Sequence, residues 1–275
     1  MSVLLLATYD TKAEEADYLI AALLALGVEV DRCDISLHAQ GVQWSPEAKL
    51  AGMQAATNRA IAEIPEHTGA GRRMVVAIGG VTGGQIALKV LQSLPLAMPK
   101  VLVTTLPFDP RYIIADSAIT LVPTIADLCG LNATTRAALD QAAAITGGLY
   151  HSTLPTGDAA LNPSIGGTSL GVTGAGTDTV CDLLHATGHE VTVFHANGFG
   201  GAAFTRWAQN GAFKSVIDYT PHELTRLYVA GVSADMPGRF TGMSHLPRVV
   251  LPGGVNFIGL GEAALMPDAY RARPH

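Results

Sequence analysis

The stretch VLLLATYDTKAEEADYLIAALLALGVEVDRCDI, residues 3–35, decides the fold class. It opens with an apolar run, passes through a polar turn at residues 8–12, and then places apolar residues at helical spacing as far as Gly27. A second strand is expected at residues 28–35. Strands that are apolar throughout and are joined by a helix are typical of a parallel sheet buried on both faces. The sequence therefore predicts an α/β protein.

The same alternation continues and then restarts after a loop at residues 151–164 that is rich in proline, glycine and polar residues. Ser45 before Pro46 predicts an N-cap followed by a first-turn proline. We expect two Rossmann-like, doubly wound and mainly parallel subdomains, 1–155 and 165–275, the second of them incomplete. The further expected elements are strands at 74–78, 101–106, 118–122, 165–172, 190–196, 215–219 and 248–254, and helices at 45–64, 85–94, 124–146, 179–187, 200–210 and 221–232.

Composition excludes several classes of protein. The 275 residues are 48% hydrophobic and 15% charged with a net charge of −6, so the basic surface of a nucleic-acid binder is missing. The opening MSVLLLATYD has neither the basic start of a signal peptide nor the length of a membrane span. Neither the cysteines nor the histidines have zinc-binding spacing, so no metal site is predicted. We expect a cytoplasmic protein that binds neither nucleic acid nor membrane, with three buried, reduced thiols at Cys33, Cys129 and Cys181.

The first candidate site is TYDTK, residues 8–12, where the first strand passes into the first helix. In open α/β sheets, ligands bind at such ends because free amides and the helix dipole attract anions. Asp10 or Thr11 can equally be a plain N-cap, and these two interpretations are evenly balanced. A first-turn Lys12 favours a phosphate partner, whereas Glu14 and Glu15 are interpreted as exposed acids that match the dipole. The candidate binding residues are Thr8, Asp10, Thr11 and Lys12.

The second candidate site is GGVTGG, residues 79–84, between an apolar strand and an amphipathic helix. Four glycines in six residues exceed the need of one tight turn and allow several amides to reach phosphate oxygens. The motif is neither GxGxxG nor GxxxxGK[ST], and close packing of helix on sheet is the alternative. Two threonines at the end of the next strand face the same crevice, although they also simply suit a strand. The candidate residues are Gly79, Gly80, Thr82, Gly83, Gly84, Thr104 and Thr105.

The third candidate site is VFHANGFGG, residues 193–201. A histidine that ends a strand, followed by Asn197 and a glycine-rich helix start, combines a titratable group with an anion-binding turn. A lone histidine is more often a structural hydrogen-bonding residue than a catalyst. The candidates are His195 as a catalytic acid or base, and Thr173, Gly198, Gly200 and Gly201 as ligand-binding residues.

These motifs recur in a fixed order along the whole chain. They are ATYDTK (7–12), IGGVTGGQIAL (78–88), PKVLVTT (99–105), the run from Asp127 to Asn132, SLGVTGAGTDTV (169–180), VFHANGFGG (193–201), the stretch TPHELTRLYVAGVSADMPGRF (220–240) and VNF (255–257). Together they resemble the tobamovirus-resistance-type ATP-binding domain family, whose bacterial members are an uncharacterised protein family. The order makes this resemblance far more specific than any single glycine-rich motif.

The resemblance implies ATP, with or without magnesium, bound on glycine-rich turns in the cleft between two Rossmann-like subdomains, and a homo-oligomer such as a dimer. Family members usually continue for about another hundred residues, so a truncated second subdomain with an unpaired edge after 248–252 is expected. After Thr105 the segment LPFDPRY departs from the family pattern, as does Val81 within the glycine motif.

Three functions stay open. They are an ATP-binding or other phosphate-ligand-binding protein, an enzyme that uses His195 on a small carboxylate or phosphorylated metabolite, and a non-catalytic interaction module. The sequence does not decide whether ATP is hydrolysed.

Overall fold

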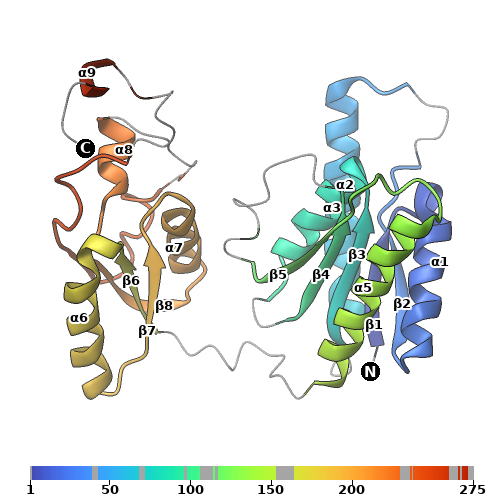
Figure 1. The fold of residues 1–275 in the computed structure, drawn as a ribbon, viewed down its shortest axis with the longest axis horizontal. Helices are drawn as coiled ribbons and strands as arrows, with labels where there is room; N and C mark the ends of the chain where they lie inside the picture. The colour runs from blue at the N-terminus through green and yellow to red at the C-terminus, as the bar shows by residue number, and fades with distance from the viewer. Residues whose placement is uncertain are drawn as a thin grey trace. The chain divides into compact units, whose positions relative to one another are not determined.

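The computed structural model describes residues 2–38, 43–67, 72–95, 98–105, 114, 117–152, 164–229, 236, 238–259, 266 and 268–271. They divide into two compact units, Met1–Ala160 and Leu161–His275 (Figure 1). The predicted linker falls largely outside the described residues. Within the described ranges, no helix is both long and apolar enough to cross a membrane. Each unit is a parallel sheet with alternating helices, which confirms the predicted α/β class.

The N-terminal unit has a five-stranded sheet. Its elements are β1 Ser2–Ala7, α1 Tyr9–Ala25, β2 Glu29–Asp34, α2 Pro46–His67, β3 Arg72–Gly79, α3 Val81–Gln92, β4 Lys100–Thr104, β5 Ile119–Pro123 and α5 Ala133–His151. The strand order is β2-β1-β3-β4-β5, and all neighbouring pairs are parallel. The strand order therefore reverses direction between β1 and β3, which makes this pair the topological switch point where open α/β sheets bind ligands.

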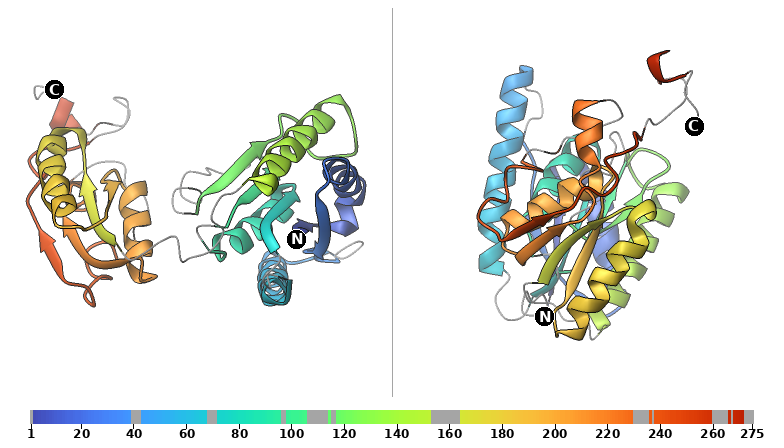
Figure 2. Two further views of the ribbon diagram at one scale, coloured as in Figure 1. Left: turned by 90° about the horizontal axis from the view of Figure 1, so that it is seen from below. Right: turned by 90° about the vertical axis from the view of Figure 1, so that its left-hand side faces the viewer.

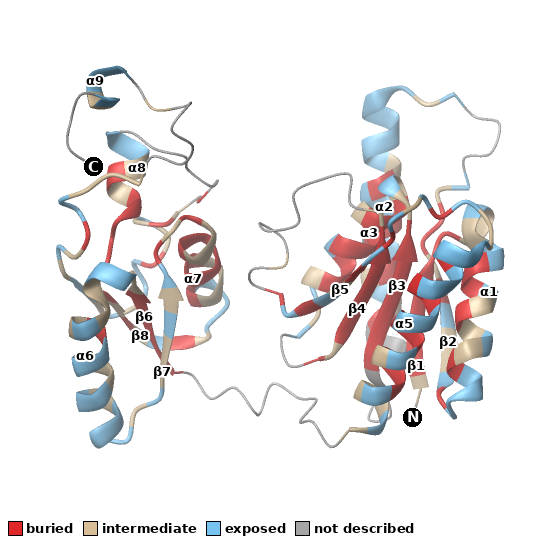
Figure 3. Cartoon of the chain, viewed as in Figure 1, coloured by how far each residue is buried: buried red, intermediate tan, exposed pale blue. Residues whose placement is uncertain are grey.

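Helices cover both faces of this sheet (Figure 2). The α1 and α5 helices pack on one face through residues such as Leu19 and Leu139, and α2 and α3 pack on the other through Met53 and Ile86. The central strands β1, β3 and β4 are buried along most of their length (Figure 3). This burial on both faces explains their continuous apolar sequence.

The C-terminal unit has a four-stranded parallel sheet. Its elements are β6 Ser164–Ser169, the 3-10 turn η2 Gly171–Thr173, α6 Gly174–Ala186, β7 Val191–His195, α7 Phe199–Gln209, β8 Phe213–Asp218, α8 Glu223–Tyr228, β9 Arg248–Val250 and α9 Asp268–Arg271. The strand order β7-β6-β8-β9 places its switch point between β6 and β8. Its core is small and aromatic, with the rings of Phe204 and Phe213 5.8 Å apart.

Capping side chains mark the positions where two of the helices begin. The Ser45 hydroxyl accepts the Ala48 amide at 3.2 Å, so the predicted N-cap is confirmed. The α5 helix, however, begins at Ala133 rather than at residue 124, because the Asn132 side chain caps its first turn. Gly130, with a φ of +73°, lies in the irregular segment that precedes this cap.

The three cysteines differ from one another. Cys33 is buried as predicted, and its pKa is raised to about 12, first by burial and then by the Glu63 carboxylate that accepts its thiol hydrogen. Cys129 is exposed and Cys181 is partly exposed. The prediction of three buried thiols is therefore wrong for Cys181 and for Cys129, which lies in the irregular segment before α5.

Candidate functional site

The β1/β3 switch point gathers three of the predicted motifs at one edge of the N-terminal sheet. Ala7 pairs with Ile78, so the turns that follow β1 and β3 start side by side. Gly79 pairs in turn with Thr104 at the end of β4. The sequence prediction that these segments lie at a common edge is confirmed by this register.

The turn in the glycine-rich motif is shorter than the sequence predicts. Gly79 ends β3, Gly80 is the N-cap of α3, and the helix begins at Val81 instead of residue 85. None of the four glycines has a positive φ. Close packing explains most of them: a Cβ on Gly83 would lie 2.9 Å from the Thr8 Cγ2 atom, and Gly79 and Gly84 are equally crowded.

Gly80 is the exception among these glycines. A Cβ built there would lie 3.8 Å from Asp127 Oδ1 and 4.0 Å from Lys12 Cε, which are ordinary contact distances. Packing therefore does not require a glycine at this position. Its lack of a side chain instead leaves the first turn of α3 uncapped, because no side chain accepts a hydrogen bond at this N-cap.

The first turn of α3 presents free amides. Only the Gly84 amide reaches back to the Gly80 carbonyl, at 2.6 Å. Among the described residues, the amides of Val81, Thr82 and Gly83 have no acceptor. These three donors point along the helix dipole at the switch point, which is the arrangement that binds phosphate or carboxylate groups.

The first turn of α1 differs, since its amides are already satisfied. The acceptors are Asp34 Oδ1 for Tyr9 (3.3 Å), Ser36 Oγ for Asp10 (3.1 Å) and the Thr8 carbonyl for Thr11 (3.0 Å) and Lys12 (2.8 Å). The N-cap is Thr8, so the interpretation of Asp10 or Thr11 as the cap is wrong. An anion at this edge would therefore meet the Lys12 side chain but no free amide of α1.

The two predicted threonines have different surroundings. Thr104 is fully buried, and its hydroxyl donates to the Gly79 carbonyl at 2.6 Å, so it joins β4 to the start of α3. The Thr105 hydroxyl is buried without a hydrogen-bond partner in the part of the chain that the structure describes, as is that of Thr124 after β5. Unpaired buried hydroxyls are uncommon and can be satisfied by a ligand or water.

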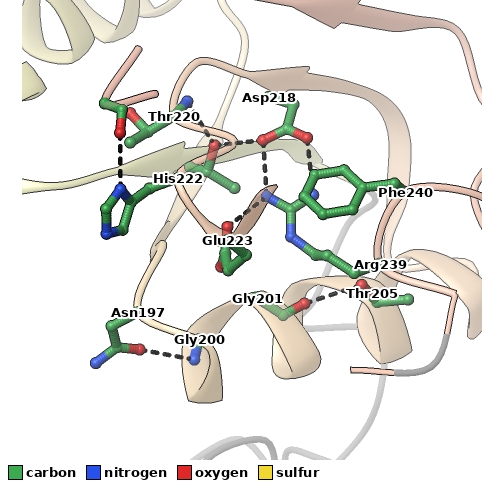
Figure 4. Close-up of polar contacts among 12 residues, drawn as sticks. Asn197, Gly200, Gly201, Thr205, Asp218, Thr220, His222, Glu223, Arg239 and Phe240 are labelled. Carbon is green, nitrogen blue, oxygen red and sulfur yellow. Dashed lines mark hydrogen bonds and ion pairs between the residues drawn. The ribbon is translucent and has the colours of Figure 1, made fainter. Parts of the chain in front are cut away.

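The C-terminal unit contains a buried charge network that the sequence analysis did not identify (Figure 4). Asp218, at the end of β8, accepts two hydrogen bonds from Arg239 at 2.7 and 2.8 Å and one from Arg248 at 2.5 Å. Arg239 also contacts Glu223 at 3.2 Å, and Thr168 donates to Asp218 at 2.7 Å. Asp218 and Glu223 are completely buried, and Arg239 is 1% exposed. Removing one member of such a network leaves a buried charge without its partner, which is costly.

Acid should weaken this network. Burial alone would raise the pKa of Asp218, but the hydrogen bonds and charge of Arg239, followed by Thr168 and Arg248, lower it below the ordinary 3.8. The unfolded chain therefore binds a proton more readily than the folded one. The stability that Asp218 contributes is complete above about pH 5 and is lost as the pH falls through the ordinary pKa and then the lower folded-state pKa.

We expect the urea midpoint of the C-terminal unit, followed by Trp207 fluorescence, to fall between about pH 5 and about pH 2. Asp218→Asn should show a smaller fall over the same range, because it has no carboxylate to protonate. An equal fall in both proteins would contradict this assignment.

The predicted residues of the C-terminal unit have structural contacts. His195 is exposed at the end of β7. The Thr173 hydroxyl bonds both Leu170 and, at 2.7 Å, Thr220. Residue 198 has a φ of +98°, which favours glycine. A Cβ on Gly200 would overlap the His195 carbonyl, and one on Gly201 would overlap the Glu223 carboxylate. The roles proposed for these residues in catalysis or ligand binding stay predictions.

Two further features bear on the alternatives. Among the described residues, no group of three or more histidine, cysteine or acidic side chains is placed to hold a metal ion.

An apolar groove of about 600 Å³ lies between α8 and β9, where Tyr228, Val229 and Val250 are exposed. Exposed apolar surface of this kind is typical of protein contact sites, so the interaction module keeps a candidate surface.

Known proteins match both units. Two family models match: the N-terminal domain of the uncharacterised protein family UPF0261 at residues 45–155, and its C-terminal domain at 162–275. A UPF0261 protein of Mesorhizobium japonicum is 31% identical over 97% of this chain and 71% of its own length. One of Clostridium tetani is 32% identical over 72% of this chain and 50% of its own. The ToMV resistance protein Tm-1(GCR237) of Solanum lycopersicum is 29% identical over 72% of this chain and 27% of its own.

Proposed function

The chain belongs to the UPF0261 family, and from this premise we propose that it binds ATP or a related nucleotide by its phosphates at the β1/β3 edge of the N-terminal sheet. The observation that carries the proposal is the uncapped first turn of α3. Its three amides lack acceptors among the described residues, and Gly80, which no packing contact requires to be glycine, keeps them open.

The side chains around these amides suit a phosphate that is bound together with a magnesium ion. The Lys12 side chain passes Gly80 and adds a positive charge. The Thr105 hydroxyl, which has no partner among the described residues, directly follows the neighbouring strand β4. The Asp127 carboxylate also lies beside Gly80 and supplies one hard oxygen donor, which suits magnesium carried in with the phosphates. The prediction that the glycine turn at 198–201 also faces the nucleotide adds nothing to this argument and stays a prediction.

Lys12→Ala should weaken the affinity for ATP about 10- to 100-fold, because it removes a charge-assisted hydrogen bond to phosphate. Adenosine, which carries no phosphate, should lose little affinity. Calorimetric titration of both ligands, with magnesium and with a chelator, measures the two effects.

The matched control is Lys89→Ala, which removes an exposed lysine from the last turn of the same α3 helix. Its affinity for ATP should equal that of the unmodified chain. Absence of any heat with ATP, ADP or inorganic triphosphate would overturn the proposed function.

A further inference from the structure

Glu15 is a buried acid where the sequence predicts an exposed one. It is 2% exposed, whereas its neighbour Glu14 is exposed. Its Oε1 atom accepts the Gly130 amide at 2.9 Å and lies 3.9 Å from the Lys12 ammonium. A carboxylate is stable at such depth only when its charge and its hydrogen bonds are matched, so these contacts account for its place in the fold.

The same cluster holds the segment between β5 and α5. Lys12 donates a hydrogen bond to the Leu128 carbonyl, and Glu15 accepts from Gly130 two residues later. The α1 helix is thus joined to residues 128–130 by one donor and one acceptor. Lys12 itself departs from helical geometry, with φ −130° and ψ 27°, so its side chain is directed by these partners and not by a regular helix.

The two groups held in this way are the charged groups beside the α3 amides. Lys12 Cε lies 4.0 Å from the Cβ position on Gly80, and Asp127 Oδ1, one residue before Leu128, lies 3.8 Å from it. Glu15 is not among the atoms that surround Gly80. It contacts Lys12 directly and holds Asp127 through Gly130 and the turn that contains both.

We infer that Glu15 is the positioning residue of the phosphate site, which fixes the Lys12 ammonium and the Asp127–Gly130 turn around the first turn of α3. This inference rests on the proposed function. The inference goes further than the proposed function because it gives Glu15 a role in placing Lys12. Glu15 itself would not touch the ligand, whereas Lys12 would. Without Glu15 the Lys12 side chain keeps its charge and the Leu128 carbonyl but loses its carboxylate partner.

The test is a double-mutant cycle between Glu15 and Lys12. Glu15→Ala should weaken ATP binding about tenfold and leave adenosine binding unchanged. In a Lys12→Ala background the same change should cost clearly less affinity, because only the contact with Gly130 is then left to lose. Glu14→Ala, which removes the same charge from the adjacent exposed position, should have no effect. If Glu15→Ala is too unstable, Glu15→Gln replaces it, since an amide oxygen still accepts from Gly130 but no longer pairs with Lys12.

A ligand-free measurement separates the two proposals. The rate at which an amine-reactive reagent modifies Lys12, followed by peptide mass spectrometry, should rise in Glu15→Ala and not in Glu14→Ala. Equal loss of ATP affinity with and without Lys12, or an unchanged Lys12 rate, would overturn the role of Glu15 alone. Failure of the unmodified chain to bind ATP, with the Lys12 rate raised as expected, would instead overturn the phosphate site itself and with it this role.

Discussion

Asp218→Ala is expected to lower the free energy of unfolding of the C-terminal unit by about 3–5 kcal/mol and to leave the N-terminal unit unchanged. The substitution removes the acceptor of two hydrogen bonds from Arg239 and leaves its buried guanidinium with Glu223 at 3.2 Å as its remaining carboxylate partner. A loss of this size is a large part of the roughly 5–15 kcal/mol that stabilises a typical domain.

The two tryptophans allow the units to be followed separately. Trp44 lies in the N-terminal unit and Trp207 in the C-terminal unit, so urea unfolding of single-tryptophan variants reports one unit at a time. Asp178→Ala, at an exposed position on α6, is the matched control and should change stability by less than about 0.5 kcal/mol. If Asp218→Ala changed the Trp207 transition as little as the control does, the network would not be a determinant of stability.

Part of this network was within reach of sequence analysis. Strand SVIDY alternates, so Asp218 falls on the same face as Val216, which is buried in the core. A charged residue at an inward position predicts a buried partner. Arg239 could not have been identified, because it lies 21 residues further on, beyond α8 and in irregular structure that has no periodicity to place it.

The burial of Glu15 could also have been predicted from the sequence, but Glu15 was interpreted only as an acid in the first helical turn. It precedes Leu19 and Leu23 at intervals of four residues, and those leucines form the buried stripe of α1. Helical periodicity therefore places Glu15 toward the interior, whereas the dipole argument considers only its distance from the helix start. Its partner Gly130 lies in a segment that the sequence predicts as helix. The Asn132 side chain starts the helix after Gly130, but in the sequence Asn132 is only one polar residue among several.

The strands and layers were predicted more reliably than the sites. Each of the expected strands has a counterpart in the structure. The central strands β1, β3 and β4 are the clearest, because they are apolar runs between turn residues, as strands buried on both faces require. Glycine-rich stretches are ambiguous by nature: the same residues serve a loop, a close contact or an open amide. At residues 79–84 the surrounding atoms decide between these roles: Thr8 crowds Gly83 and Thr104 crowds Gly84, whereas Gly80 has only ordinary contacts.

Gly80→Asp and Gly83→Val should separate the binding role of this motif from its packing role. An aspartate at the N-cap can accept the free amides of α3, so stability should change by less than about 1 kcal/mol, while its carboxylate takes the place of phosphate.

We expect ATP affinity in Gly80→Asp to fall about 100-fold or more, because several charge-assisted hydrogen bonds are lost together and a like charge is added. Gly83→Val should behave in the opposite way. Its Cβ would lie 2.9 Å from the Thr8 side chain, so overpacking should destabilise the N-terminal unit by about 1–3 kcal/mol. Gly148→Asp adds the same charge at an exposed position with open space around it and should leave both quantities unchanged. Urea unfolding followed by Trp44 and calorimetry with ATP measure the two effects, and full ATP affinity in a folded Gly80→Asp chain would assign the whole motif to packing.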